Sequence, residues 1–329
     1  HDLADSFVMV SQDNGDTWER TNLVDFPVDL YVLDSGLPEE GEDINDDGLF
    51  QEYFNTDGAG TLVIDNDGGV HVFYGEMYYM DDDLGDANFS YFPGMNGLHY
   101  WNESMGADSS QVVAYAYDLD ESGALELEDD IALYFVSLSG FPSCAVDADN
   151  NLFVTYSAVM ETHTTGAQNY RHVYLVQSMD GGETWNTETA CNLTPDEDFD
   201  GFECVFASMN PDVDGQVRLL YQRDFEPGLH VRGDLDPPSV NDLVYMDFNM
   251  DELAECVIVG VDENLKPSDI TLYPNPSDGL VQLLVTKPGQ SVISIYDLTG
   301  KQVFQTTTFG ILEQMDLRYL PAGLYVLEV

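Results

Sequence analysis

Two acidic stretches have the oxygen spacing of a calcium-binding loop. The first places ligands at positions 1, 3, 5, 9 and 12 of a twelve-residue loop with glycine at position 6, and these ligands are Asp118, Asp120, Ser122, Glu126 and Asp129. Carboxylate and hydroxyl oxygens at this spacing suit Ca²⁺, and glycine allows the sharp turn. The second stretch has only the first half of the pattern, in Asp43, Asn45 and Asp47. We therefore expect calcium as a cofactor, held weakly because Asp129 stands where a bidentate glutamate is usual.

A cluster of aromatic residues has the composition of a sugar-binding surface. It lies in the stretch 77–102, between two expected strands, and its candidate ligand-binding residues are Tyr78, Tyr79, Tyr91, Tyr100 and Trp101. Aromatic rings stack on the C–H groups of a sugar, while neighbouring acids and amides bind its hydroxyl groups. The alternative is that these rings pack down onto the strands.

The sequence offers no catalytic centre by motif. It contains neither HExxH nor CxxC, nor a glycine-rich loop that would cradle phosphate. Some pair of carboxylates is inevitable among 62 acidic residues, so a pair alone does not indicate a glycosidase. We assign no catalytic residue and expect a protein that is not an enzyme, or otherwise a glycoside hydrolase.

The charge is concentrated in the first part of the chain. Residues 266–329 hold four basic and six acidic residues, so −51 of the net charge of −53 belongs to residues 1–265. Nucleic acids and anionic membranes are poor partners for such a surface. Adaptation to salty water and binding of divalent cations both remain open as explanations. No run of eighteen apolar residues occurs, so we expect no membrane span.

This shift in charge predicts the domain boundary. We expect an acidic domain over 1–262, a polar linker over 263–269 and a second domain over 270–329. The four cysteines suit an oxidising compartment. Cys191 and Cys204 flank a short acidic segment and are expected to pair, which would leave Cys144 to pair with Cys256. Other pairings and free buried thiols remain open.

Two kinds of repeat run through the acidic domain. Each copy of the first follows an apolar strand and has Ser, Asp, Gly, Thr and Trp at the same spacing: Ser11, Asp13, Gly15, Thr17 and Trp18, and again Ser178, Asp180, Gly182, Thr184 and Trp185. In such a turn the aspartate accepts amide hydrogens and the glycine permits a positive φ. The second repeat, over 61–74, 144–156 and 210–221, is a strand, an acidic turn and a strand that ends in an aromatic residue.

The first repeat resembles the Asp box (BNR repeat) of sialidase-like β-propellers. The resemblance implies that the second repeat forms the inner half of each blade, with blades starting near 61, 143 and 208. It also raises the question of whether the protein is a sialidase. In that case Arg171, Arg218, Arg223 and Arg232 would supply the arginines that hold the substrate carboxylate. The Arg-Ile-Pro element of that family is absent, and the acidic surface would repel an anionic sugar.

The last sixty residues have turn signals that predict a small β-sandwich. Pro274 and Pro276 precede one strand, 297–301 is a polar turn, and Pro321-Ala322-Gly323 precedes the last strand. These landmarks resemble the C-terminal sorting domain of the type IX secretion system of Bacteroidetes. The resemblance implies export across the outer membrane, with the secretion machinery as a partner. We expect a further strand beyond Val329 and a precursor that begins upstream of His1.

The sequence thus predicts an all-β fold: an Asp-box β-propeller, complete or incomplete in this chain, followed by a small C-terminal β-sandwich. The expected function is non-catalytic binding or adhesion, to a glycan, a protein or a second copy, outside the cell or on its surface. The alternatives are an extracellular glycoside hydrolase and a structural surface protein bridged by calcium.

Overall fold

The computed structural model describes residues 3–26, 53–80, 89–195, 201–233 and 238–255, and most of 270–328. The chain divides into two compact units, His1–Ile258 and Val259–Val329. Within the described ranges, no helix has the length and apolar character needed to cross a membrane. Three expectations lie outside the described residues: the half loop at Asp43, Asn45 and Asp47, the linker 263–269, and Cys256.

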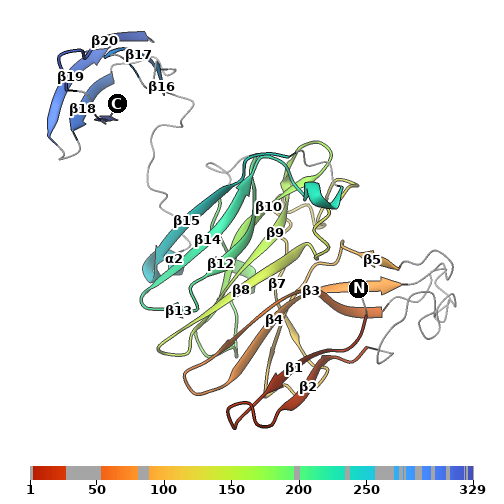
Figure 1. The fold of residues 1–329 in the computed structure, drawn as a ribbon. Coiled ribbons are helices and arrows are strands. Elements are labelled where there is room, and N and C mark those ends of the chain that lie inside the picture. The colour runs from red at the N-terminus through yellow and green to blue at the C-terminus, as the bar shows by residue number, and fades with distance from the viewer. Residues whose placement is uncertain are drawn as a thin grey trace. The chain divides into compact units, whose positions relative to one another are not determined.

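The first unit consists of antiparallel sheets that follow one another along the chain (Figure 1). The first hairpin is β1 (Ser6–Val10) and β2 (Glu19–Val24), and the second sheet is β3 (Tyr53–Ile64), β4 (Val70–Met80), β6 (Leu98–Asn102) and β7 (Gln111–Ala114), with β5 (Ser90–Phe92) paired to β4. The third sheet is β8 (Ser139–Asp147), β9 (Leu152–Thr164), β10 (Asn169–Ser178) and β11 (Cys191–Asn192). The last sheet is β12 (Glu203–Met209), β14 (Gln216–Asp224) and β15 (Asp242–Asn249).

Short elements complete this unit. The strand β13 (Asp212–Val213) pairs with β8 in parallel and so links the third sheet to the last. Two 3₁₀ turns, η1 (Thr187–Thr189) and η2 (His230–Arg232), lie in the connections, and α2 (Met250–Glu255) follows β15.

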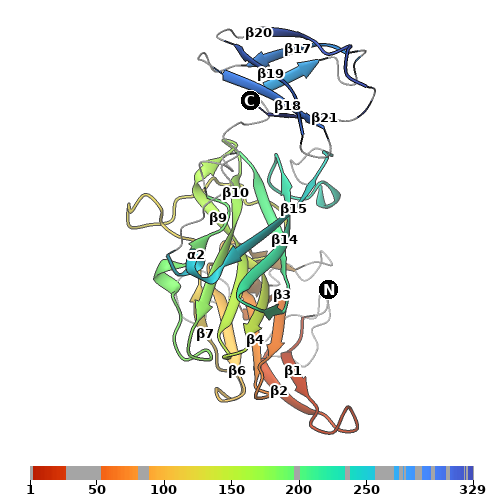
Figure 2. The ribbon, with the colours of Figure 1, turned by 90° about the vertical axis from the view of Figure 1, so that its left-hand side faces the viewer.

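The sheets are arranged face to face, like the blades of a propeller (Figures 1 and 2). The first strands of the second, third and last sheets are neighbours, because β3 contacts β8 and β8 contacts β12. The expected hairpins at 61–74 and 144–156 are present as β3–β4 and β8–β9, whereas at 210–221 β14 pairs with the preceding β12 and β13 pairs with β8. The all-β prediction is confirmed, and the sheets do not close into a ring within the described part of the chain.

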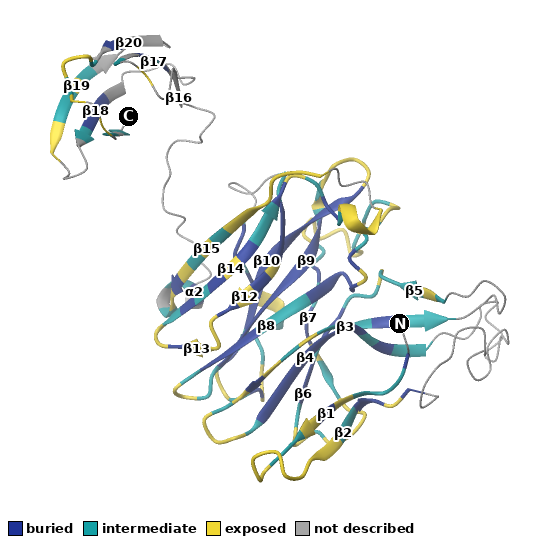
Figure 3. Cartoon of the chain, viewed as in Figure 1, coloured by how far each residue is buried: buried dark blue, intermediate teal, exposed yellow. Residues whose placement is uncertain are grey.

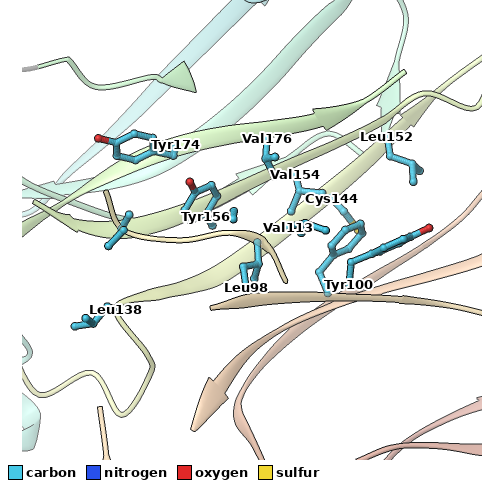
Figure 4. Close-up of a cluster of buried hydrophobic side chains, with 14 of the residues drawn as sticks. Leu98, Tyr100, Val113, Leu138, Cys144, Leu152, Val154, Tyr156, Tyr174 and Val176 are labelled. Carbon is cyan, nitrogen blue, oxygen red and sulfur yellow. The ribbon is translucent and has the colours of Figure 1, made fainter. Parts of the chain in front are cut away.

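Apolar cores lie between successive sheets, as the buried strands in Figure 3 show. Figure 4 shows the core between the second and third sheets, to which Leu98, Tyr100, Tyr174 and Val176 belong. The strand β9 is buried along Leu152–Met160 because sheets cover both of its faces. In β14, by contrast, Val217, Leu219 and Tyr221 are buried while Leu220 is exposed. This strand is therefore covered on one face only.

The second unit is the expected sandwich of two small sheets. One contains β16 (Ile270–Tyr273), β17 (Leu280–Val285) and β20 (Leu312–Asp316), and the other contains β18 (Ser291–Asp297), β19 (Gln302–Thr308) and β21 (Tyr325–Glu328). Their shared core is Val281, Leu283, Ile293, Ile295 and Met315. Gly279 has a φ of +96°, and a Cβ there would stand 2.9 Å from the backbone of Arg318, so this position requires glycine.

The cysteine pairing differs from the expectation. Cys144 and Cys204 are free, buried thiols. Neither Cys191–Cys204 nor Cys144–Cys256 therefore forms, because each of these pairs includes one of the free thiols. Burial raises the pKa of the Cys144 thiol to about 11 and that of Cys204 further, so both act as small apolar residues of the core.

Candidate functional site

The first strands of the second, third and last sheets of the first unit have an irregular register. The shifts fall between Thr56 and Gly60 in β3, between Gly140 and Ser143 in β8, and between Val205 and Ser208 in β12. A bulge of this kind bends the strand and turns a side chain away from the regular alternation. Equivalent strands of three neighbouring sheets thus present irregular segments that include Asp57, Phe141 and Phe206.

Three phenylalanines near these segments have a left-handed backbone. The φ angles are 60° at Phe135, 55° at Phe141 and 58° at Phe206. Such angles are uncommon for a bulky side chain and cost roughly 1–3 kcal/mol each. Strain of this kind is typical of functional sites, where the surrounding structure holds a side chain in an unfavourable position.

Two of the strained phenylalanines, Phe141 and Phe206, belong to one aromatic cluster with Tyr134, and Phe135 belongs to a separate ring pair. Phe141 and Phe206 have ring centroids 4.6 Å apart, and Tyr134 meets them edge-on at 5.6 and 5.9 Å. Phe135 lies 5.0 Å from Tyr91. The cluster therefore joins the last sheet to β8 and the segment that precedes it, and the Phe135–Tyr91 pair joins that segment to β5.

A cavity of about 530 Å³ opens beside this cluster. Its aromatic lining is Tyr79, Phe89, Tyr91, Tyr134, Phe135 and Phe141. Its polar lining includes Asp5, Ser6, Asn55, Thr56, Asp57 and Arg232. A volume of this size, with a wall of aromatic and other apolar residues and several polar groups, is compatible with a small-molecule site.

Asp57 is the buried carboxylate of the cavity. Its Oδ1 accepts a hydrogen bond from the Ala59 amide at 2.9 Å, and its Oδ2 accepts from the amide and hydroxyl of Ser137 at 3.1 and 3.4 Å. A Cβ on Gly75 would stand 2.0 Å from Oδ2, so only glycine leaves room for the carboxylate. Burial raises the pKa of Asp57 to about 6.

A second buried group of ionisable side chains lies beside Tyr134. The Arg171 amide donates to Glu203 Oε2 at 2.5 Å, and Arg171 Nη1 donates to the Leu138 and Ser157 carbonyls at 3.2 and 3.4 Å. The Arg171 guanidinium lies 5.5 Å from the Tyr134 ring centre. Burial raises the pKa of Glu203 to about 8 and that of Tyr134 well above 10. Arg171 and Glu203 are fully buried and do not line the cavity.

The four arginines that a sialidase site would need have separate partners. Arg218 pairs with Asp214 at 2.6 Å and Arg223 with Asp242 at 2.9 Å. Arg232 lines the cavity and lies over the Phe135 ring at 4.7 Å from its centre. Only this one of the four arginines reaches the cavity, so they do not converge on one anion.

The structure separates the five predicted ligand-binding aromatics. Tyr79 and Tyr91 line the cavity, and the Tyr79 hydroxyl donates to the Thr56 carbonyl at 2.9 Å. Tyr78 packs edge-on against Phe54 instead. Tyr100 and Trp101 lie away from the cavity, fully buried in the cores on either side of the second sheet.

The sequence reasoning missed Asp57 and the strained phenylalanines. The signal at Phe141 was the neighbouring Pro142, since proline cannot donate to a strand ladder and so marks an edge or a bulge. No comparable local signal marks Asp57, whose burial depends on contacts with residues about eighty positions away.

The loop 118–129 brings some of its predicted ligands together. Asp118, Asp120 and Glu161 have carboxylate oxygens within 4.8 Å of one another. Glu161 comes from β9, so the sequence pattern missed it. Ser122 donates to Glu126 Oε2 at 2.9 Å, and neither Glu126 nor Asp129 belongs to the group of three. Three converging carboxylates suit a hard cation, and calcium remains a prediction.

The two Asp-box segments (11–18 and 178–185) form the same hydrogen-bonded turn. In the first, Gly15 N donates to Ser11 Oγ at 2.7 Å, and Thr17 Oγ1 donates to Asp13 Oδ2 at 2.6 Å. The matching distances in the second, from Gly182 and Thr184, are 2.8 and 2.6 Å. The hydrogen bond from the threonine hydroxyl lowers the pKa of both aspartates, that of Asp180 to about 2.

Comparison with solved structures finds distant similarity to several proteins. An α-L-arabinanase of Penicillium chrysogenum is 11% identical over 69% of this chain and 56% of its own, with a TM-score of 0.32. A Hadza microbial sialidase is 13% identical over 88% and 49%, with a TM-score of 0.34. A family 117 glycoside hydrolase of the marine bacterium Zobellia galactanivorans is 11% identical over 81% and 75%, with a TM-score of 0.30. The chain thus spans about half the length of the first two.

Comparison by sequence finds a family match within the second unit. No curated protein matches the chain at a significant level. Residues 271–329 match the family described as the secretion system C-terminal sorting domain. The second unit is therefore a sorting domain, and the protein is exported by the type IX secretion system to the cell surface or the extracellular space.

Proposed function

We propose that the first unit is a non-catalytic binding module that holds a neutral sugar in the aromatic cavity. The observation that carries this proposal is the left-handed backbone of Phe135 and Phe141, whose side chains line the cavity. A fold that needed only apolar packing there would gain stability from glycine or from a regular strand. The strain is explained if the ring positions serve a ligand.

The composition of the cavity wall fits a sugar. Tyr91 and Phe135 offer ring faces on which sugar C–H groups stack, and Asn55 and Thr56 offer polar groups for hydroxyls. An anionic ligand would approach against a net charge of −53 and would find one arginine, Arg232. A neutral ligand avoids this repulsion.

The carboxylates of the cavity are poorly placed for hydrolysis. A glycosidase needs two carboxyl groups on either side of the scissile bond, about 5–10 Å apart. Both oxygens of Asp57 already accept hydrogen bonds, and Asp5 is paired with Arg20 at 2.7 Å. One observation favours a hydrolase as the second candidate, since a carboxyl group with a pKa near 6 suits a general acid.

We also propose that calcium binds at the loop 118–129 as a cofactor. The convergence of Asp118, Asp120 and Glu161 supports it. An ion there would tie the loop to β9, and it would leave the cavity as the ligand site. The structural alternative, in which calcium bridges copies of the protein, predicts association that a chelator reverses.

The test of this proposal is a titration with oligosaccharides. Neutral cellohexaose, xylohexaose and arabinohexaose serve as probes, and 3′-sialyllactose is the anionic comparator. We expect at least one neutral probe to bind, and we expect Tyr91→Ala to weaken binding by roughly tenfold or more. Tyr78→Ala is the matched control, because Tyr78 lies on the same strand as Tyr79 but outside the cavity. Equal losses in both variants, or binding of the sialoside alone, would contradict the proposal.

A further inference from the structure

A serine, a histidine and a glutamate form one chain of hydrogen bonds in the second sheet. Ser110 Oγ lies 2.8 Å from His99 Nδ1, and His99 Nε2 lies 2.9 Å from Glu76 Oε2. Glu76 is in β4, His99 is in β6, and Ser110 directly precedes β7. The side chains of His99 and Glu76 are 12% and 15% exposed, and Ser110 is partly exposed, so the group is shielded but reachable from solvent.

The two hydrogen bonds define where the protons of this group lie. An ionised glutamate can only accept hydrogen bonds, so the Glu76 carboxylate accepts from His99 Nε2–H. In a neutral imidazole the other ring nitrogen is then an acceptor, and His99 Nδ1 accepts from the Ser110 hydroxyl. A serine nucleophile needs this arrangement, in which a base lies within reach of the hydroxyl and a carboxylate orients the base.

The fold holds the histidine ring in this position. The His99 ring stacks on Tyr74 with ring centroids 5.4 Å apart, and the Phe54 ring lies at the same distance. A Cβ on Gly97 would stand 2.8 Å from the Glu76 carboxyl carbon, so glycine at this position leaves room for the carboxylate. Neighbouring residues thus orient both the base and the carboxylate that it contacts.

A buried tyrosine hydroxyl lies beside the serine. Tyr74 is 2% exposed, and its hydroxyl has no hydrogen-bond partner within the described part of the chain. Burial raises the pKa of Tyr74, and the Ser110 hydroxyl is close enough to oppose that rise. A buried donor without a partner is costly in a folded protein. Next to a nucleophile, such a donor stabilises the negative oxygen that forms during acyl transfer.

We propose that this group is a second functional site, at which Ser110, activated by His99, cleaves small esters that carry no negative charge. The Ser110 oxygen attacks the ester carbonyl carbon while its proton passes to His99 Nδ1, and the Tyr74 hydroxyl donates to the carbonyl oxygen. The bond from this carbon to the alcohol oxygen breaks, and His99 gives the proton to the alcohol. Water then attacks the acyl-serine with His99 as base, which releases the carboxylic acid and restores Ser110. Glu76 is a positioning residue that acts through His99.

The surroundings of the serine exclude anionic esters. A polar cavity of about 480 Å³ begins two residues before Ser110, at Asp108, and it is also lined by Asp5, Arg20 and Asp25. Arg20 is paired with Asp5 at 2.7 Å, so the other two aspartates leave the cavity acidic. The net charge of −53 adds to this repulsion of anions. None of the reacting residues lines the aromatic cavity, so ester cleavage is additional to sugar binding there.

A fluorophosphonate probe tests the nucleophile directly, because the probe bonds to an activated serine and releases fluoride. The 329-residue protein is incubated with the probe, digested and analysed by mass spectrometry. We expect the label on Ser110. Ser110→Ala should abolish labelling, and Ser109→Ala should keep it, because Ser109 is the exposed neighbouring serine. A wild-type protein without label, or with equal label in Ser110→Ala, overturns the proposal.

Hydrolysis of 4-nitrophenyl acetate tests the roles of the other residues. Tyr74→Phe removes only the hydroxyl and should lower kcat roughly a hundredfold with KM unchanged. Glu76→Gln should lower kcat by roughly a hundredfold or more, because the glutamine amide donates to His99 Nε2 and leaves the proton on Nδ1. Circular dichroism checks that both variants fold. Wild-type kcat in either variant overturns the role of that residue, and wild-type activity in Ser110→Ala overturns the proposal.

Discussion

Trp185 packs edge-on against Tyr100, with ring centroids 5.0 Å apart, and so joins the second Asp-box segment to the neighbouring sheet. Beside it, a Cβ on Gly182 would stand only 2.0 Å from the Tyr100 hydroxyl. In the first Asp-box segment, a Cβ on Gly15 would meet only Trp18, at 3.8 Å. One local turn thus connects two sheets in one place and forms part of an exposed face in another.

Alanine at the two glycines separates backbone strain from packing. Both glycines have a φ of +93°, so alanine costs about 1–2 kcal/mol at either position. Gly182→Ala should cost about 1–3 kcal/mol more, because Tyr100 must move. Urea unfolding measures both losses. Equal losses would show that Tyr100 does not constrain the turn.

The contributions of Asp57 and Glu203 to stability should fall as pH rises from about 4 to 8. Burial raises the pKa of Asp57 from 3.8 to about 6 and that of Glu203 from 4.5 to about 8. Each group binds its proton more tightly in the folded protein, so its contribution to stability is greatest below the unfolded pKa and is lost as pH rises through the folded pKa. The slope is up to about 1.4 kcal/mol per pH unit for each group.

Two variants show which residue causes the pH dependence of stability. Asp57→Asn should flatten the profile below about pH 6, and Glu203→Gln should flatten it up to about pH 8. The free energy of unfolding is measured in about 1 M NaCl, which screens the repulsion among surface acids. Variants that keep the wild-type slope would contradict the prediction.

Calcium should bind the group formed by Asp118, Asp120 and Glu161. We expect a dissociation constant of about 0.1–1 mM by calorimetry, and a higher unfolding temperature with calcium than with a chelator. Asp120→Asn and Glu161→Gln should each abolish this stabilisation. Asp129→Asn is the matched control, because Asp129 is in the sequence pattern but outside the group of three. An equal loss in the control would favour the sequence pattern over the structural group.

Substitution of Phe135 separates strain from function. Phe135→Gly and Phe135→Ala both remove the ring that lies beside Tyr91, so both should lose sugar binding equally. Phe135→Gly should be the more stable of the two by about 1 kcal/mol, because glycine tolerates a φ of 60°. Two variants of equal stability would show that the backbone there is not strained.

The elements that the sequence predicted are those that depend on local chemistry. The Asp-box turns depend on hydrogen bonds between residues four apart, such as Asp13 and Thr17, and so the motif is sufficient. Strand alternation and turn residues likewise predict the β8–β9 hairpin and the strands of the sorting domain.

The parts that the sequence missed depend on distant residues. Asp57 is held by Ser137, and Glu161 joins Asp118 from a different strand, contacts that no spacing reveals. The sequence could not show that Tyr100 and Trp101 are core residues, because a fully buried sheet needs aromatic residues as much as a sugar site does. The bulges that direct Phe141 and Phe206 are features of strand register, which depends on the partner strands.

Binding without cleavage is the central claim, and calorimetric titration followed by recovery of the ligand tests it most directly. The protein is titrated with the neutral hexasaccharides and then incubated with them for a day before the sugars are analysed by mass spectrometry. The account predicts saturable heat with at least one of them, loss of that heat in Tyr91→Ala, and recovery of the intact hexasaccharide. Shortened sugars in the wild-type sample that are absent with Asp57→Asn would instead show a glycoside hydrolase.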